Sequence, residues 1–146
     1  MMVIISQFIY ASILNKPEKR LLYIDEGWML MEHTDSAKFL SGLIRRARKH
    51  YLGVTIITQQ ANDFLSSDFG KVIASQSSLR ILLRQDTTSI AKVKSEFKLS
   101  EYEKDYLLTA GKGEALIIAD TIHTACNVIA SRREHPLITT DPTEME

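Results

Sequence analysis

An apolar run that stops on two acidic residues constrains the fold of this 146-residue chain more than any other feature. Residues 21–24 are all apolar, and Asp25, Glu26 and Gly27 follow them directly. Continuous rather than alternating hydrophobicity is typical of a strand that is buried on both faces of a parallel sheet. Such a strand brings its last residues to the carboxyl edge of the sheet, where α/β proteins bind ligands. The sequence therefore predicts an α/β fold with two carboxylates at a binding edge.

The rest of the chain alternates between helical and strand patterns, which favours a layered α/β fold. Helices are expected over residues 36–51, 68–76, 87–97 and 100–110, and strands over residues 54–58, 79–83, 114–119 and 123–130. Ser100 and Glu103 predict a capping box at the start of the last of these helices. The last two strands predict an antiparallel hairpin. We therefore expect a mostly parallel sheet, flanked by helices, with a C-terminal antiparallel hairpin.

The two ends of the chain differ in character. Residues 1–14 are nearly all apolar, but the run is shorter than the roughly 20 residues of a membrane-spanning helix. It also lacks the basic start and the cleavage site of a signal peptide, so we expect a buried helix. Residues 136–146 form a polar, Thr-rich tail. No linker divides the chain, and residues 1–146 are expected to form a single domain.

Composition excludes several classes of function. Lys plus Arg equals Asp plus Glu at 18 each, so no global field attracts nucleic acid or an acidic membrane. The single cysteine, Cys126, excludes an internal disulfide. Cys126 and His123 are only two ligands, which do not make a zinc cage.

A second strand end carries polar side chains that complement the two carboxylates. The strand over residues 54–58 runs into Thr58, Gln59 and Gln60. In a nucleotide motor, Asp25 would hold Mg²⁺ through water, and Glu26 would orient and deprotonate the water that attacks the γ-phosphate. Gln59 would hydrogen-bond that water or the γ-phosphate. Two ordinary solvated strand ends are the simpler alternative for each motif taken alone.

A basic cluster lies between the two strands. Arg45, Arg48 and Lys49 share one helix face by their spacing. A solvated basic face is the simplest interpretation, but one arginine would also suit the nucleotide of a neighbouring subunit, as an arginine finger. We expect the end of this helix to lie near the carboxyl edge. Arg48 is the first choice, Lys49 the second and Arg84, after the third strand, a weaker third.

Taken in order, these segments resemble the large ATPase of type IV secretion and conjugative transfer systems. The resemblance rests on residues 24–28, on residues 45–49 with Gly53, and on residues 57–60, 113–117 and 137–142. It implies a partial RecA-like P-loop NTPase core of the FtsK/HerA type. It also implies a hexameric or otherwise oligomeric motor on the cytoplasmic side of the inner membrane that works with secretion-channel proteins.

The resemblance implies a role for each matching residue. Asp25 and Glu26 correspond to the Walker B pair, with Asp25 holding Mg²⁺ and Glu26 acting as the catalytic base. Gln59 corresponds to the sensor, and Arg48 is the candidate finger that acts in trans. ATP and Mg²⁺ are the implied substrate and metal.

The chain departs from the family in one respect: no G-x-x-x-x-G-K-[ST] segment occurs in it. Without this loop the backbone cradle for phosphates is missing. We therefore expect a chain that does not hydrolyse ATP alone and that uses ATP and Mg²⁺ only when a phosphate-binding loop is supplied. We also expect open edges on the strands beginning at Val54 and Leu79, and hence a dimer or a swapped assembly.

Three alternatives remain open on sequence grounds. A DNA-translocating coupling ATPase of the FtsK kind would need basic residues and aromatics around a pore, so direct nucleic-acid binding is not expected of this neutral chain. A non-catalytic interaction module would use Trp28 as a partner anchor. A Mg²⁺-dependent phosphatase or nuclease would need more clustered acids than Asp25 and Glu26.

Overall fold

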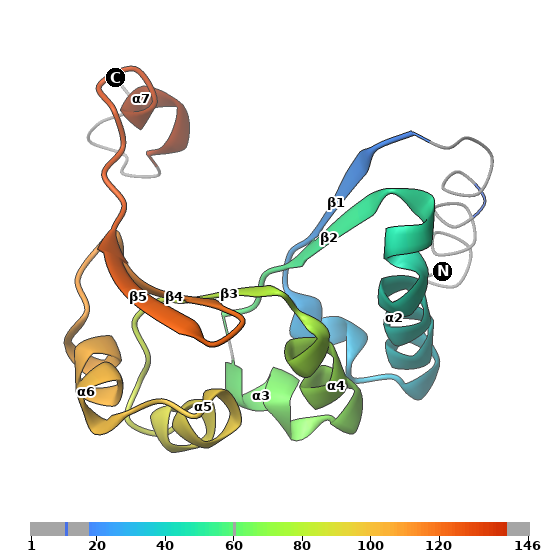
Figure 1. Ribbon diagram of the computed structural model, residues 1–146, viewed down its shortest axis with the longest axis horizontal. Helices are drawn as coiled ribbons and strands as arrows, with labels where there is room; N and C mark the ends of the chain where they lie inside the picture. The colour runs from blue at the N-terminus through green and yellow to red at the C-terminus, as the bar shows by residue number, and fades with distance from the viewer. Residues whose placement is uncertain (1–10, 12–17, 60, 140–146) are drawn as a thin grey trace. The chain divides into compact units, whose positions relative to one another are not determined.

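The computed structural model describes residues 11, 18–59 and 61–139, which belong to two compact units (Figure 1). The first unit comprises Met1–Ser78 and Thr87–Leu99, and the second comprises Leu79–Asp86 and Ser100–Glu146. The chain therefore leaves the first unit once, returns to it, and leaves it again.

The first unit combines a short parallel sheet with helices (Figure 1). In chain order its elements are β1 (Arg20–Ile24), the 3-10 helix η1 (Gly27–Leu30), α2 (Thr34–Ala47), the 3-10 helix η2 (Arg48–His50), β2 (Leu52–Ile56), α3 (Ala61–Ser66), α4 (Asp68–Gln76) and α5 (Ile90–Phe97). β1 and β2 pair in parallel from Arg20 opposite Leu52 to Ile24 opposite Ile56. α2 connects the two strands and packs on β2 and α4. The buried core is Ala37, Leu40, Leu43, Ala47, Leu52, Phe64, Leu65, Ile73, Ala74, Ile90, Val93 and Leu99.

Within the described residues, only one face of the β1–β2 sheet is covered. Leu22 and Ile24 are half-buried, whereas Leu21 and Tyr23 are 71% and 64% exposed. The prediction that this strand is buried on both faces is therefore wrong for the residues described. Successive side chains of a strand point to opposite faces, and α2 packs on only one of them.

α3 and α4 approach each other too closely for a side chain at Gly70. A Cβ atom at this position of α4 would lie 1.9 Å from the carbonyl oxygen of Phe64 in α3. Because the obstacle is backbone, it has no alternative rotamer. Glycine is therefore required at this crossing.

The second unit is an antiparallel sheet with a helix packed on it. Its elements are β3 (Leu79–Leu82), α6 (Glu101–Thr109), β4 (Glu114–Ala119), β5 (Ile122–Asn127) and α7 (His135–Ile138). The strand order is β3-β4-β5, with both pairings antiparallel. Its buried residues are Leu82, Leu107, Ala110, Ala115, Leu116 and Ile118.

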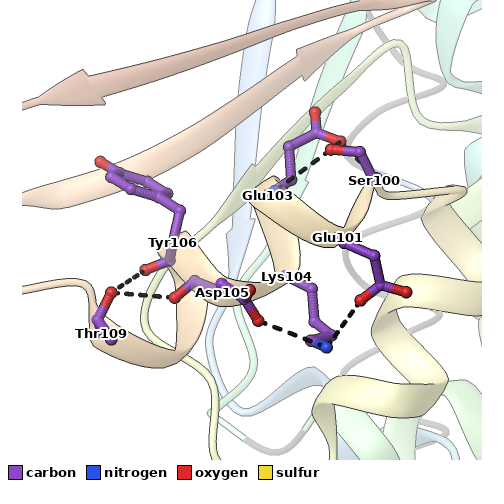
Figure 2. A network of polar contacts seen from close by, with 7 residues as sticks. All are labelled: Ser100, Glu101, Glu103, Lys104, Asp105, Tyr106 and Thr109. Atoms are coloured by element: carbon purple, nitrogen blue, oxygen red, sulfur yellow. Dashed lines mark hydrogen bonds and ion pairs between the residues drawn. The ribbon is translucent and has the colours of Figure 1, made fainter.

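α6 begins at the predicted capping box. The Ser100 hydroxyl accepts a hydrogen bond of 3.3 Å from the Glu103 backbone N–H, and the Glu103 carboxylate accepts one of 2.7 Å from the Ser100 N–H. Further along the helix, Lys104 Nζ lies 2.7 Å from Glu101 and 3.4 Å from Asp105 (Figure 2). Local contacts of this kind stabilise a helix without tertiary partners.

The α/β fold class is confirmed, and most predicted elements lie within a few residues of their expected positions. The predicted helix over residues 68–76 has the same bounds as α4, and the predicted hairpin is β4–β5. The sequence analysis missed η1, α3 and α7, because none of them is long enough for helical periodicity to be visible. The expected helix over residues 1–14 lies outside the described residues, apart from Ala11.

One pairing differs from the expectation. β3 does not extend the parallel strands but pairs antiparallel with β4, with Leu82 opposite Leu116. This register places two buried leucines on the same face of the sheet, where they join the core with Leu107 of α6. Among the described strands, β2 pairs only with β1 and β3 only with β4, so each keeps one edge without a partner there. The association expected from these edges stays a prediction.

None of the helices within residues 18–59 and 61–139 is long and apolar enough to cross a membrane.

The crossing of α3 and α4 is testable with a pair of helical glycines. Gly70→Ala is expected to lower the free energy of unfolding by about 1–3 kcal/mol, because the new methyl group collides with the Phe64 carbonyl. Gly42→Ala in α2 is the control, since its Cβ meets only the far end of the Arg46 side chain, at 3.3 Å, and no backbone atom of another element. It is expected to stabilise the protein by roughly 0.5–1 kcal/mol. Urea unfolding would measure both, and equal effects of the two substitutions would contradict the required close approach.

Candidate functional site

The carboxyl edge of the parallel sheet carries the two predicted acids. Asp25 follows β1 directly and is exposed, while Glu26 is half-buried. The Glu26 backbone is left-handed, with φ 51° and ψ 46°, which is uncommon for a residue with a Cβ atom. Its N–H donates a hydrogen bond of 2.9 Å to Asp25 Oδ1. The turn after β1 thus separates the directions of two neighbouring acids.

Two backbone hydrogen bonds tie this turn to the end of β2. The Ile57 N–H donates to the Ile24 carbonyl, and the Gly27 N–H donates to the Ile57 carbonyl, both at 2.8 Å. Gly27 is buried, and a Cβ atom there would lie 2.3 Å from Ile56 Cγ2. The absence of a side chain at Gly27 therefore allows the two strand ends to come together.

The same edge receives the polar end of β2. Thr58 and Gln59 come directly after Ile57, and Gln59 is exposed. The structure therefore brings Asp25, Glu26 and Gln59 to one edge of the sheet, as the sequence predicts, and Gln60 lies outside the described residues.

The donors at this edge are hard oxygens, which suit Mg²⁺. Asp25 has one carboxylate oxygen engaged by the Glu26 N–H, and among the described residues its second oxygen has no protein partner. Mg²⁺ keeps several waters and needs only one or two carboxylates from the protein. No group of three or more His, Cys, Asp or Glu side chains that would form an all-protein cage occurs within the described residues. Asp25 therefore fits a water-mediated Mg²⁺ ligand.

The basic cluster lies at the opposite edge of the sheet. Arg48 and Lys49 precede β2, and the Tyr51 carbonyl accepts a hydrogen bond of 3.0 Å from the N–H of Arg20, the first residue of β1. The five-residue strands separate the two edges by roughly 13–17 Å at ~3.3 Å per residue. The expected position of this helix end is wrong, because a helix that connects two parallel strands runs back from their carboxyl ends to their amino ends. Within one chain, the cluster is not brought beside Asp25.

The finger candidates keep their roles only as predictions. Arg48 and Lys49 are exposed at the amino edge, away from Asp25 of their own chain. Arg84 follows β3 in the second unit and is also exposed.

A family model decides what kind of chain this is. The model of the TraG P-loop domain matches residues 1–120. The chain belongs to the TraG P-loop family. The resemblance to the ATPases of type IV secretion and conjugative transfer is thereby confirmed.

A solved structure of the same class supports this assignment. The chain is similar to VirB4 of Thermoanaerobacter pseudethanolicus, with a TM-score of 0.80 and 27% sequence identity over 87% of this chain. The chain spans 36% of the length of that VirB4. No curated protein matches it. The partial RecA-like fold predicted from the sequence is confirmed by this match.

Trp28, the partner anchor of the alternative interaction module, contacts Glu26 in this TraG P-loop chain. Its indole Nε1–H donates a hydrogen bond of 2.7 Å to Glu26 Oε2, and its ring is half-buried. The indole is therefore engaged within the site. Glu26 and Trp28 are only two positions apart and lie in no predicted helix or strand, so the sequence gives no signal for this contact. The contact accompanies the left-handed turn at Glu26, which only the structure shows.

A second half-buried polar contact lies in the other unit. His123 Nδ1 of β5 lies 2.6 Å from Glu103 Oε1 of α6. Burial alone would raise the pKa of Glu103, but the hydrogen bonds from Ser100 and His123 outweigh it and hold the pKa below its ordinary value of 4.5. The pair fastens the helix to the hairpin. Twenty residues separate its members, so the sequence contains no signal for it.

The close approach of the two strand ends at Gly27 can be tested by adding a methyl group there. Gly27→Ala is expected to lower the free energy of unfolding by about 1–3 kcal/mol, because its Cβ would collide with Ile56. Hydrogen exchange at the amides of residues 27 and 57 is expected to accelerate as the two strand ends separate. Gly111→Ala, whose Cβ meets its nearest neighbour at 3.6 Å, is the control. Unchanged exchange at both amides would contradict this close approach of the strand ends.

The Glu103 contact makes the stability of the second unit depend on pH. Because the folded-state pKa is lowered, the contribution is fully present above the ordinary value of 4.5 and is lost as the pH falls through the folded value. Glu103→Gln is expected to lose about 1 kcal/mol at pH 7, and the difference from wild type is expected to shrink on acidification. Urea unfolding at several pH values would measure this, with Glu101→Gln as the exposed control. A difference that grows on acidification would contradict it.

Proposed function

We propose that this chain provides the carboxylate and sensor half of the nucleotide site of an ATP-hydrolysing motor. The observation that supports this best is the pair of backbone hydrogen bonds that joins the turn at Asp25 and Glu26 to the end of β2. A hydrolysis site needs its base and its phosphate-sensing group at one place, and these bonds hold both strand ends at one edge. Family membership supplies the reaction class, ATP hydrolysis in type IV secretion and conjugation.

In the proposed reaction, Glu26 acts as the general base. Its carboxylate takes a proton from the attacking water while the water oxygen bonds to the γ-phosphorus. The bond from that phosphorus to the β–γ bridging oxygen breaks, and the electron pair leaves with ADP. The Gln59 amide hydrogen-bonds the water or the γ-phosphate. The half-buried position of Glu26 limits the water that competes for its carboxylate.

Asp25 is proposed to hold Mg²⁺ through water. When bound, the ion neutralises charge on the phosphate oxygens. Asp25 suits this position because it is exposed at the strand end, and because the Glu26 N–H fixes one of its oxygens and leaves the other directed away from that bond. This arrangement keeps the two carboxylates in different roles.

The phosphate cradle has to come from another segment or chain, because the sequence has no Walker A loop. We propose that both compact units belong to one motor domain and that the site is completed only when this loop is supplied. Self-association, as a hexamer in the intact machine or as a dimer or swapped assembly of this chain, would place Arg48 against a neighbour's nucleotide. The position of Arg48 at the amino edge is compatible only with such a role in trans.

The proposed biological role follows the family. The assembled motor would energise assembly of, or substrate transfer through, a type IV secretion system. It would work at the cytoplasmic face of the inner membrane, against secretion-channel proteins.

Calorimetry on the chain alone tests whether the site is incomplete. Titration with a non-hydrolysable ATP analogue and Mg²⁺ is expected to give no saturable heat, because no backbone cradle binds the phosphates. Saturable binding that is lost in Asp25→Ala would contradict the expectation and would show a cradle within this chain.

Hydrolysis is tested in a chimera in which this chain replaces the matching 36% of the VirB4 chain. Glu26→Gln is expected to lower kcat by about 10²- to 10⁴-fold with nucleotide binding retained. Glu32→Gln, an exposed acid six residues on, is the control. A chimera that binds nucleotide but turns over equally fast with Glu26→Gln would overturn the role of Glu26.

A further inference from the structure

We propose that Trp28 is a positioning residue of this site, which holds the Glu26 carboxylate in the orientation needed for proton transfer. The inference rests on the proposed function of Glu26 and assigns to Trp28 a role in the reaction that composition and spacing do not reveal.

The first argument is the hydrogen bond itself. Trp28 Nε1 lies 2.7 Å from Glu26 Oε2, which is short for an N–H donor. Hydrogen bonds to a carboxylate are stronger than those between neutral groups. Among the described residues, the other oxygen, Oε1, has no protein partner. One oxygen is thus held while the other stays available to water.

The second argument is the chemistry of the donor. The indole N–H donates but has no lone pair that accepts a proton. It therefore orients the carboxylate without competing for the proton that Glu26 must take. Unlike lysine or arginine, it also adds no positive charge beside the base or beside the Mg²⁺ ligand Asp25.

The third argument is the rigidity of the support. η1 begins directly after Glu26, and the Met29 N–H donates to the Glu26 carbonyl at 3.0 Å. The Met31 N–H donates to the Trp28 carbonyl at 2.9 Å, and η1 packs on α2 and α3. The Trp28 ring is therefore attached to a backbone that hydrogen bonds hold in place, directly after Gly27 and its bond to Ile57.

These features together explain why the Glu26 carboxylate needs a hydrogen-bond donor that orients it. A glutamate side chain has several rotatable bonds and loses considerable entropy when it is fixed. The left-handed backbone at Glu26 sets only its starting direction. The indole fixes the far end, so the base is oriented before nucleotide arrives, which is where an enzyme gains rate from proximity.

The hydrogen bond is tested on the chain as it is. Trp28 is the only tryptophan, so its indole N–H gives a single, unambiguous signal in a proton–nitrogen NMR spectrum. Exchange of this proton with water is expected to accelerate by about tenfold or more in Glu26→Ala, and not in Glu32→Ala. Equal exchange in wild type and Glu26→Ala would overturn the contact.

The functional role is tested in the VirB4 chimera by a double-mutant cycle. Trp28→Phe keeps an aromatic ring but removes the N–H, and it is expected to lower kcat by about 10- to 100-fold while the KM for ATP stays within twofold. In a Glu26→Gln background, the same substitution is expected to have little further effect, because the base it positions is already absent.

The outcomes separate the two proposals. If Glu26→Gln abolishes turnover but Trp28→Phe leaves kcat unchanged, or lowers it equally in both backgrounds, the positioning role is overturned and the proposed function stands. If Glu26→Gln itself has no effect, the proposed function fails, and the role of Trp28 fails with it. If Trp28→Phe does not fold, the NMR comparison of Glu26→Ala with wild type still decides the contact.

Discussion

The site depends on two backbone hydrogen bonds of 2.8 Å, from Ile57 to Ile24 and from Gly27 to Ile57. They extend the parallel pairing beyond the last residues of β1 and β2 and close the turn that carries Asp25 and Glu26. A methyl group at Gly27 would collide with Ile56, so the closure requires glycine. The left-handed conformation of Glu26 and the start of η1 both follow from this closure. The backbone therefore sets the starting direction of these polar side chains, and the Trp28 indole then holds the Glu26 carboxylate.

These two hydrogen bonds determine which chemical groups lie at the carboxyl edge of the sheet. They separate two adjacent acids into an exposed Asp25 and a half-buried Glu26 that Trp28 holds by one oxygen. In the proposed reaction, Glu26 would act as the base and Asp25 as a water-mediated metal ligand, and β2 would add the amide of Gln59. The edge supplies no cradle for phosphates, since the backbone N–H groups of a Walker A loop are absent from the sequence. Under the proposed function, this edge is the half of the motor site that acts on water rather than the half that binds phosphate.

The direction of α2 places the basic residues at the other edge of the same sheet. A helix that connects parallel strands returns from their carboxyl ends to their amino ends, so the basic residues at its end lie far from the acids of the same chain. Arg48 is therefore separated from Asp25 by the length of the sheet. In the proposed oligomeric motor, one edge would serve the chain's own nucleotide and the other would serve the nucleotide of a neighbour. The second unit has buried leucines of its own and the Glu103–His123 pair.

The sequence by itself determined the α/β class, most of the elements and the edge at which Asp25, Glu26 and Gln59 meet. These follow from local patterns, because a run of apolar residues followed by polar ones marks a strand and its end, and parallel strands end at the same edge. The Ser100–Glu103 capping box is equally local. Only the tertiary structure decided that β3 pairs with the hairpin, that Leu21 and Tyr23 are exposed, and that the basic cluster lies at the amino edge. It alone revealed the contacts of Trp28 with Glu26 and of His123 with Glu103. Such features depend on which surfaces meet and in which direction an element runs, and neither is encoded in the spacing of residues along the chain.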